Sequence, residues 1–261
     1  MVDVGTRRAL VGAVVVCLPT YNEAATVSPV ATAIASLGYR VLIIDDNSPD
    51  GTGTIADRLA AASASISVIH RTAKEGLGKA YSAGFGAAHA MGADIICEID
   101  CDFSHDPNDL PRLVDAVAEG ADVAIGSRYV PGGSAPHWSV GRRLLSLGGN
   151  WYTRKMLGLS VRDATAGFRA YRATSLSSLD PGGCGASGYG FQVEMTYRAS
   201  RSGMTIVEVP ITFRDRTEGT SKMDRSIVIE AMTLVTRWGV QRALGRGYEP
   251  AAPRTVAPSV R

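Results

Sequence analysis

The chain alternates short apolar runs with alanine-rich stretches of helical length up to about residue 130, and this alternation limits its possible folds more than any other feature. The apolar runs cover residues 11–18, 40–44, 67–70, 94–99 and 123–125, with helices expected over 24–37, 54–62, 78–91 and 108–119. Runs that are apolar throughout are typical of parallel strands covered on both faces. We therefore predict an α/β fold with a doubly wound sheet that binds its ligands at the carboxyl ends of the strands.

The alternation is less regular after residue 130. We expect helices over 142–157, 187–202 and 227–244 and a strand over 206–213. No repeat or linker separates two cores, so we predict one domain over residues 1–249 and a disordered tail, rich in Pro and Ala, over 250–261. The segment 226–244 carries an apolar stripe at helical spacing and nearby arginines, which predicts an amphipathic helix lying on a membrane surface. The alternative is that this stripe packs on the core. The stripe consists of Ile227, Ala231, Leu234, Val235 and Trp238.

Composition excludes several classes of protein. Apolar residues make up 45% of the chain, enough for a large core, and the net charge of +2 gives no reason to expect a nucleic-acid partner. The four cysteines form no CxxC pair, so neither a zinc site nor a disulfide framework is expected and a reducing cytoplasm fits best. We expect no signal peptide and no membrane span, because no apolar run reaches about 18 residues.

Two polar motifs follow the first two predicted strands. "PTYNE" (19–23) combines an aromatic ring with a carboxylate, which suits a nucleotide base and ribose, although Asn22 or Glu23 can equally cap the next helix. "IIDDNSPDGT" (43–52) ends a strand with two consecutive aspartates. One of them can contact a ribose or base; a helix cap explains Asp50 but not the pair Asp45–Asp46.

Two further motifs follow later strands. In "RTAKEGLGKAY" (71–81), two glycines precede a helix whose amides can face an anion, or they only make the loop flexible. In "EIDCDFSHDP" (98–107), Asp100 and Asp102 form a DxD that can bind Mg²⁺ or Mn²⁺ together with substrate phosphates. The competing interpretation is a helix start at residues 106–108. Cys101 is too soft a ligand for these ions and is expected to pack.

These motifs, followed by "GSRY", "DATAGFRAYR", "GYGFQVEM" and "EVPITFRDRTEGTSK", resemble the polyprenol (dolichol) phosphate mannose synthases over residues 9–239. That family consists of inverting family-2 glycosyltransferases with the GT-A fold, a Rossmann-like, mostly parallel sheet with helices on both faces. The resemblance implies GDP-mannose as donor, a polyprenyl monophosphate as acceptor and Mg²⁺ or Mn²⁺ as cofactor. The chain departs from the family at Cys101, where alanine is usual, and in lacking the C-terminal membrane helices of some relatives. Attachment to the cytoplasmic face of a membrane, by surface helices or by a membrane-protein partner, is the implied alternative.

The resemblance also assigns individual residues. The matching nucleoside contacts are Pro19, Tyr21, Glu23, Ile44 and Asp46. The metal ligands match Asp100 and Asp102, with Cys101 between them in the donor site. The phosphate contacts match Arg128, Arg216 and Lys222, and the acceptor-phosphate contact matches Arg142. Asp102, Arg128 and Arg142 are the expected catalytic residues. Glu194 is a candidate for the sugar site, although an ordinary carboxylate on a helix face explains it equally well. For any single arginine or lysine, a solvated surface position is the alternative.

A basic and aromatic stretch bears on the acceptor. Residues 137–172 contain seven arginines and lysines and one acid, interleaved with tryptophan and leucine. This pattern suits an anionic headgroup on a hydrocarbon surface and argues against a soluble acceptor, although a helix that solvates its arginines explains it as well. Two other functions remain open from sequence. One is the same fold with UDP-glucose or another sugar nucleotide, and the other is a non-catalytic nucleotide-binding subunit of a membrane complex.

Overall fold

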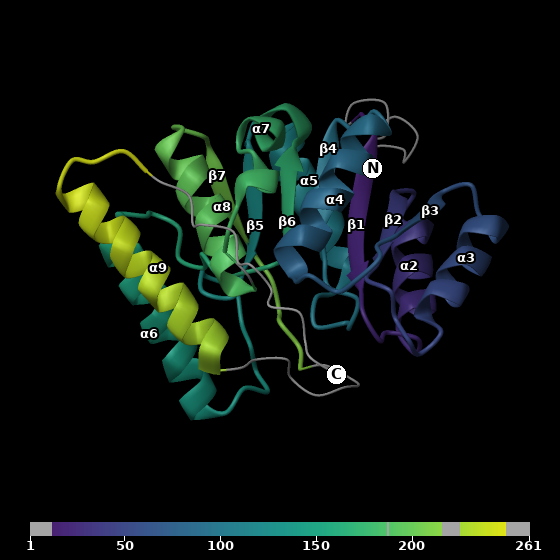
Figure 1. Cartoon of the computed structure of the whole chain (residues 1–261), viewed down its shortest axis with the longest axis horizontal. Helices are drawn as coiled ribbons and strands as arrows, with labels where there is room; N and C mark the ends of the chain where they lie inside the picture. The colour runs from purple at the N-terminus through teal and green to yellow at the C-terminus, as the bar shows by residue number, and fades with distance from the viewer. Residues whose placement is uncertain (1–11, 187, 216–224, 249–261) are drawn as a thin grey trace.

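The computed structural model describes residues 12–186, 188–215 and 225–248, which form a seven-stranded sheet in the order β3-β2-β1-β4-β6-β5-β7 (Figure 1). The strands are β1 Val14–Thr20, β2 Arg40–Asp45, β3 Ile66–His70, β4 Ile95–Glu98, β5 Val123–Ser127, β6 Arg169–Arg172 and β7 Ile206–Pro210. The neighbouring pairs are parallel except that β6 runs antiparallel to both β4 and β5. The predicted α/β fold is confirmed, whereas β6 was not predicted, because its sequence RAYR offers no apolar run.

Helices cover both faces of this sheet. On one face lie α2 Val27–Ser36, α3 Thr52–Ala62 and α5 Leu110–Ala118, packed against Val14, Val16 and Leu18 of β1. On the other face lie α4 Leu77–Ala90, α7 Ala173–Ser178 and α8 Tyr189–Arg201, packed against Val15 and Cys17 of the same strand. Successive strand residues point to opposite faces, so a strand covered twice must be apolar throughout. Two short 3₁₀ helices, Pro107–Asp109 and Pro181–Gly183, complete the connections.

The helices α6 Val140–Leu157 and α9 Arg225–Ala243 lie side by side beyond the β7 edge of the sheet, and α9 also packs on α8 (Figure 1). Val235 and Trp238 of α9 are fully buried against residues of α6 and α8. The apolar stripe of α9 therefore packs on the protein, and the prediction that it lies on a membrane is wrong. The stripe showed only that one face of the helix is apolar, not what covers that face. The Ile227 side chain lies outside the described residues.

The surface of α6 exposes more apolar side chains than that of α9, on which Ile229 and Val240 are exposed. Val140, Leu144, Leu145 and Trp151 are all exposed, Val140 by 75% of its surface. Among the described residues, no helix combines the length and apolarity that crossing a bilayer requires.

Three sharp turns bring polar side chains to one edge of the sheet. Asn22, Asn47 and Phe103 follow β1, β2 and β4, and each has a φ of 57–58°. This left-handed conformation is uncommon for residues other than glycine, most of all for a bulky one such as Phe103. Such strain is typical of functional sites, so these turns locate where the site should be sought.

Candidate active site

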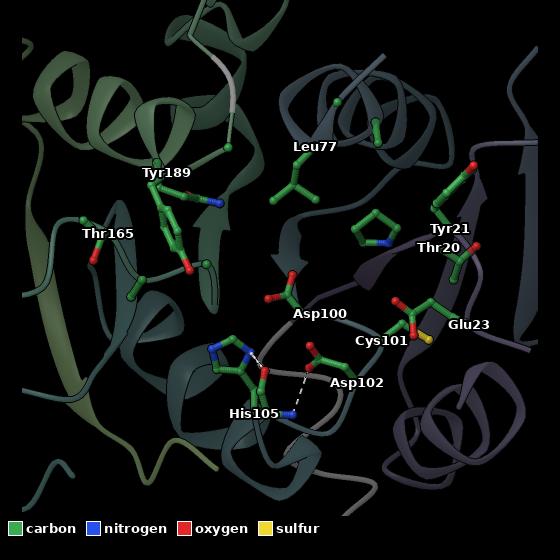
Figure 2. Close-up of a pocket in the computed structure, with 18 of the residues that line it drawn as sticks. Thr20, Tyr21, Glu23, Leu77, Asp100, Cys101, Asp102, His105, Thr165 and Tyr189 are labelled. Atoms are coloured by element: carbon green, nitrogen blue, oxygen red, sulfur yellow. Dashed lines mark hydrogen bonds between the residues drawn. The ribbon is translucent and has the colours of Figure 1, made fainter. Parts of the chain in front are cut away.

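A cavity of about 550 Å³ opens at the carboxyl ends of β1, β2 and β4. Figure 2 shows Thr20, Tyr21 and Glu23 on one side of it and Thr165 and Tyr189 on the opposite side. Asp100 and Asp102 lie between the two sides (Figure 2). The position agrees with the rule that open α/β sheets bind ligands outside the carboxyl ends of their strands.

The first side of the cavity carries groups suited to a nucleoside. An Arg71 guanidinium nitrogen lies 2.5 Å from a carboxylate oxygen of Asp46, and a second one lies 2.6 Å from Glu75. Burial raises the pKa of Asp46 more than the contact with Arg71 lowers it. The Lys74 ammonium lies 4.0 Å from the centre of the Tyr21 ring. Tyr21, Asp46 and Lys74 thus offer the cavity an aromatic face, a carboxylate and a cation, and Arg71 holds Asp46 from behind the lining.

The consecutive aspartates at the end of β2 have different surroundings. The Asp46 side chain lines the cavity, whereas Asp45 accepts a 2.6 Å hydrogen bond from the Ser48 hydroxyl and a longer one from Thr20. Asp45 thus stabilises the turn after the strand, and Asp46 is the one that can contact a ligand.

The DxD residues lie in the middle of the cavity. Asp102 accepts a 2.9 Å hydrogen bond from the Ser104 amide, which closes the tight turn at Phe103. Asp100 and Asp102 provide hard oxygen donors of the kind that Mg²⁺ and Mn²⁺ prefer. No cluster of three or more His, Cys, Asp or Glu side chains suited to a metal occurs among the described residues. The two carboxylates fit a divalent cation by the chemistry of their donor atoms.

Cys101 behaves as a packing residue. Its side chain is 3% exposed, and its sulfur lies 3.9 Å from the Thr26 hydroxyl. Burial raises the pKa of the thiol well above its usual value, so the group stays protonated and is a poor metal ligand.

Two arginines line the far side of the cavity in contrasting surroundings. Arg128 is buried and donates two hydrogen bonds, of 2.7 and 2.6 Å, to the fully buried Asp163. Burial opposes the charge of Arg128, but Asp163 raises the pKa of the guanidinium above its usual value. Arg142 is partly exposed; it donates a 2.8 Å hydrogen bond to Asp215 and stacks over Trp138 at 4.3 Å.

A second cavity, of about 400 Å³, continues from this side between α6 and α9. Arg128, Arg142, Thr165 and Tyr189 line both cavities. Most of the remaining wall of the second cavity is apolar, from Leu144, Leu145, Val193, Val228, Met232 and Val235. The site is thus a polar chamber joined to an apolar groove through two arginines.

Comparison with known proteins places this arrangement in a family. The sequence profile of the family described as "Glycosyl transferase family 2" matches residues 15–179. The chain belongs to glycosyl transferase family 2. It is 49% identical over 231 residues to an undecaprenyl-phosphate mannosyltransferase from Micrococcus luteus, covering 87% of this chain and 94% of the relative. It is 46% identical over 244 residues to a polyprenol monophosphomannose synthase from Mycolicibacterium smegmatis, covering 92% and 90%.

A solved structure of this glycosyltransferase fold is similar to the whole chain. It is the glucosyl-3-phosphoglycerate synthase of Mycobacterium tuberculosis in complex with Mn²⁺, UDP-glucose and phosphoglyceric acid. The TM-score is 0.67 at 20% identity, over 95% of this chain and 85% of the other. The likeness supports the predicted GT-A architecture. The family match and the two relatives confirm the predicted resemblance and the prediction of a glycosyltransferase.

The structure brings most of the predicted site residues of this glycosyltransferase together. The predicted residues that line the first cavity are Pro19, Tyr21, Glu23, Asp46, Asp100, Cys101, Asp102, Arg128 and Arg142. Ile44 differs, because its side chain is fully buried in the core and lies against Gly84 of α4. Only the backbone of Ile44 is therefore placed to contact a nucleoside, and that contact stays a prediction. Arg216 and Lys222 lie outside the described residues.

Glu194 corrects one expectation. It is fully buried and accepts hydrogen bonds from Arg198 at 2.7 Å and from the Tyr248 hydroxyl at 2.5 Å. It does not line the cavity. The neighbouring Gln192 does so instead, since residues two apart on a helix point in different directions.

Sequence reasoning missed several groups of this glycosyltransferase site. Lys74, which lines the cavity, and Arg71, which pairs with Asp46, lie in the loop after β3, where only the glycines had drawn attention. From sequence, Asp163 was expected at the far wall of the site with no chemistry assigned to it, and the structure shows that it holds Arg128. An acidic residue 35 positions away from an arginine gives no local signal of their pairing.

Proposed function

We propose that this glycosyltransferase transfers mannose from GDP-mannose to a polyprenyl monophosphate, with inversion at the sugar, to give polyprenyl phosphate mannose. The observation that carries the proposal is the continuity of the polar chamber with the apolar groove through Arg128 and Arg142. A lipid phosphate requires both, with a charged head beside the sugar and a hydrocarbon tail in the groove. The names of the Micrococcus and Mycolicibacterium relatives support the sugar and the class of acceptor.

The donor would occupy the side of the cavity formed by β1 and β2. Tyr21 and Lys74 would contact the nucleoside, and Asp46 would accept hydrogen bonds from its hydroxyl or amino groups. Asp100 and Asp102 would hold Mg²⁺ or Mn²⁺, which when bound neutralises charge on the leaving diphosphate. The Mn²⁺ in the Mycobacterium tuberculosis enzyme supports a divalent ion without selecting between the two.

The acceptor would bind with its phosphate between Arg128 and Arg142. A phosphate monoester has a second pKa of about 6 and is mostly dianionic near neutral pH, so it needs no general base. One of its oxygens would attack the anomeric carbon from the face opposite the diphosphate. The bond from that carbon to the diphosphate would break, and the electron pair would leave with GDP. Arg128, fixed by Asp163, and Arg142 would orient the attacking phosphate, and such positioning supplies much of the rate.

We propose further that α6 lies on the cytoplasmic face of a membrane. Leu144, Leu145 and Trp151 are exposed on it, and Arg143 and Lys155 are exposed on the same helix. An exposed apolar face with nearby cations is typical of helices lying in the membrane interface. The four cysteines are free and buried, which agrees with a reducing compartment. This assigns to α6 the role that sequence had suggested for α9.

A matrix of donors and acceptors tests the proposal. GDP-mannose, UDP-glucose and UDP-GlcNAc would each be offered with a long polyprenyl phosphate in liposomes, a short prenyl phosphate in solution, and 3-phosphoglycerate. We expect transfer with GDP-mannose to both prenyl phosphates and none to 3-phosphoglycerate. Preference for a UDP-sugar would contradict the donor, and transfer to 3-phosphoglycerate at a comparable rate would contradict the acceptor. Absence of transfer in every combination would favour a non-catalytic subunit.

A further inference from the structure

Arg142 meets a carboxylate at the place where the acceptor phosphate is expected. Its guanidinium donates a 2.8 Å hydrogen bond to Asp215, 73 residues later in the chain, and both side chains line the polar chamber. We propose that Asp215 is an internal competitor for Arg142, which holds the arginine until an anionic phosphate displaces it and takes the arginine back when the product leaves. The identity of that phosphate, a prenyl monophosphate, rests on the function proposed above.

The geometry of the pair suits displacement. The Arg142 and Asp215 side chains are 34% and 41% exposed and meet through one hydrogen bond. The Arg128–Asp163 pair is 7% and 0% exposed, and the Arg128 backbone amide also donates to Asp163 at 3.0 Å. Exposed single pairs typically change an equilibrium constant by a factor of about two to five, whereas buried, multiply bonded pairs resist separation. Asp163 is thus a permanent partner and Asp215 an exchangeable one.

Both members of the exchangeable pair are held in place by neighbours. Arg142 lies over the Trp138 ring, and Phe213 packs edge-on against the same ring at 5.4 Å. The Phe213 amide donates to the Ser134 carbonyl and the Arg214 amide donates to the Ser104 carbonyl, so the backbone just before Asp215 is anchored on two sides. A displaced Asp215 carboxylate therefore stays close to Arg142 and can return to it.

The charges of substrate and product give this exchange a direction. The acceptor monoester carries a charge near −2 at neutral pH. Transfer converts one of its phosphate oxygens into a bridge to the sugar, which leaves a phosphodiester of charge −1. The substrate therefore attracts Arg142 more strongly than Asp215 does. The phosphate of the product carries the same single negative charge as Asp215, so it has no such advantage. Asp215 thus permits substrate binding and favours product release. It also lowers the occupancy of Arg142 by small free anions, which gain nothing from the apolar groove.

The test compares Asp215→Asn with Asp106→Asn. Asp106 lies 3.6 Å from Arg214, the neighbour of Asp215, so each substitution removes one negative charge beside the same segment. We expect Asp215→Asn to lower the KM for a short prenyl phosphate, and the inhibition constants of inorganic phosphate and of the prenyl phosphate mannose product, by about two- to fivefold. The Kd for GDP should not change, and the effect should shrink as ionic strength rises. Asp106→Asn should leave all these constants unchanged.

A binding measurement separates this inference from the proposed function. Inorganic phosphate, titrated calorimetrically in the presence of EDTA, should bind Asp215→Asn about two- to fivefold more tightly than the wild type. In an Arg142→Ala background, Asp215→Asn should have no effect, as a double-mutant cycle requires of directly competing groups. A higher acceptor KM in Asp215→Asn, or an equal change in Asp106→Asn, would overturn the inference. Failure of the wild type to use any prenyl phosphate would overturn the proposed function instead, and the titration would still decide the role of Asp215.

Discussion

The donor side and the acceptor side of the site are built in different ways. Donor-side groups such as Tyr21, Asp46 and Asp100 come from turns that directly follow buried strands. Of the acceptor-side groups, Arg128 also directly follows a buried strand, β5, whereas Arg142 comes from α6 and Thr165 and Asp215 come from loops. Strand ends position most of the donor side, whereas both acceptor-side arginines are oriented by ion pairs, with Asp163 and Asp215. Changes to the donor side should therefore affect the reaction with every acceptor, and changes to the acceptor side should affect lipid use or stability.

The DxD should show the largest effect, because it is the part of the donor side nearest the expected chemistry. Asp102→Asn should lower kcat about a thousandfold, since a metal ion typically supplies several kcal/mol of transition-state stabilisation. EDTA should have the same effect on the wild type, with recovery on addition of Mg²⁺ or Mn²⁺. Asp109→Asn, on the following 3₁₀ helix, is the control and should retain activity. Full activity of Asp102→Asn at saturating metal would remove this motif from the reaction.

The acceptor side can be divided by comparing its two aspartates. Asp163→Ala leaves Arg128 charged and buried, so the free energy of unfolding should fall by about 3–5 kcal/mol. Asp215→Ala should change it by less than about 1 kcal/mol, because that pair is screened by solvent. Urea unfolding of both variants measures the difference. Equal losses of stability would mean that both ion pairs stabilise the fold to the same extent, and would contradict the view that only the Arg128–Asp163 pair is permanent.

A pH experiment tests the buried carboxyl of Glu98, which lies at the strand end just before the DxD. Glu98, at the end of β4, is fully buried and accepts a 3.2 Å hydrogen bond from Tyr171, and burial raises the pKa of its carboxyl from 4.5 to about 7. Between these values the folded state keeps a proton that the unfolded state has lost. Stability should therefore fall as pH rises from about 4.5 to 7 and then level off.

Glu98→Gln removes this titration. Relative to the wild type it should gain about 3 kcal/mol of unfolding free energy between pH 5 and pH 8, as measured by urea unfolding at each pH. Identical pH profiles for the two proteins would show that Glu98 keeps an ordinary pKa. In that case the positive charge of Arg169, 3.5 Å from Glu98, would favour the ionised carboxylate more than burial disfavours it.

The smallest effect is expected at the nucleoside end. Lys74→Ala removes the cation over the Tyr21 ring and should raise the Kd for GDP about two- to fivefold, with no change in the KM of the acceptor. Lys79→Ala, an exposed lysine on α4 that does not line the cavity, is the matched control for lost charge. A shift in acceptor KM with Lys74→Ala would mean that the two sides are not separable.

The sequence was sufficient for the strand-end motifs of the donor side, but not for Arg71 and Lys74, and only partly for the acceptor side. Motifs at the ends of β1, β2 and β4 could be placed together because parallel strands share one edge, so their residues meet whatever the loops do. The partners of the arginines could not be placed, because Asp163 and Asp215 lie 35 and 73 residues away in the chain. The prediction of what covers the apolar stripe of α9 failed for a related reason. Val235 and Trp238 are apolar whether a membrane or the helices α6 and α8 lie against them.

The late position of β6 in the chain has a consequence for synthesis of the protein. In the described part of the sheet, β6 alone joins β3-β2-β1-β4 to β5-β7, yet it occupies residues 169–172, long after β4 ends at residue 98. At ordinary translation rates the ribosome needs roughly ten seconds to make the intervening segment. During that time one edge of β4 has no neighbour, and exposed strand edges favour aggregation. A chain stalled before residue 169 lacks the strand that covers this edge of β4 and is therefore not a smaller version of the fold.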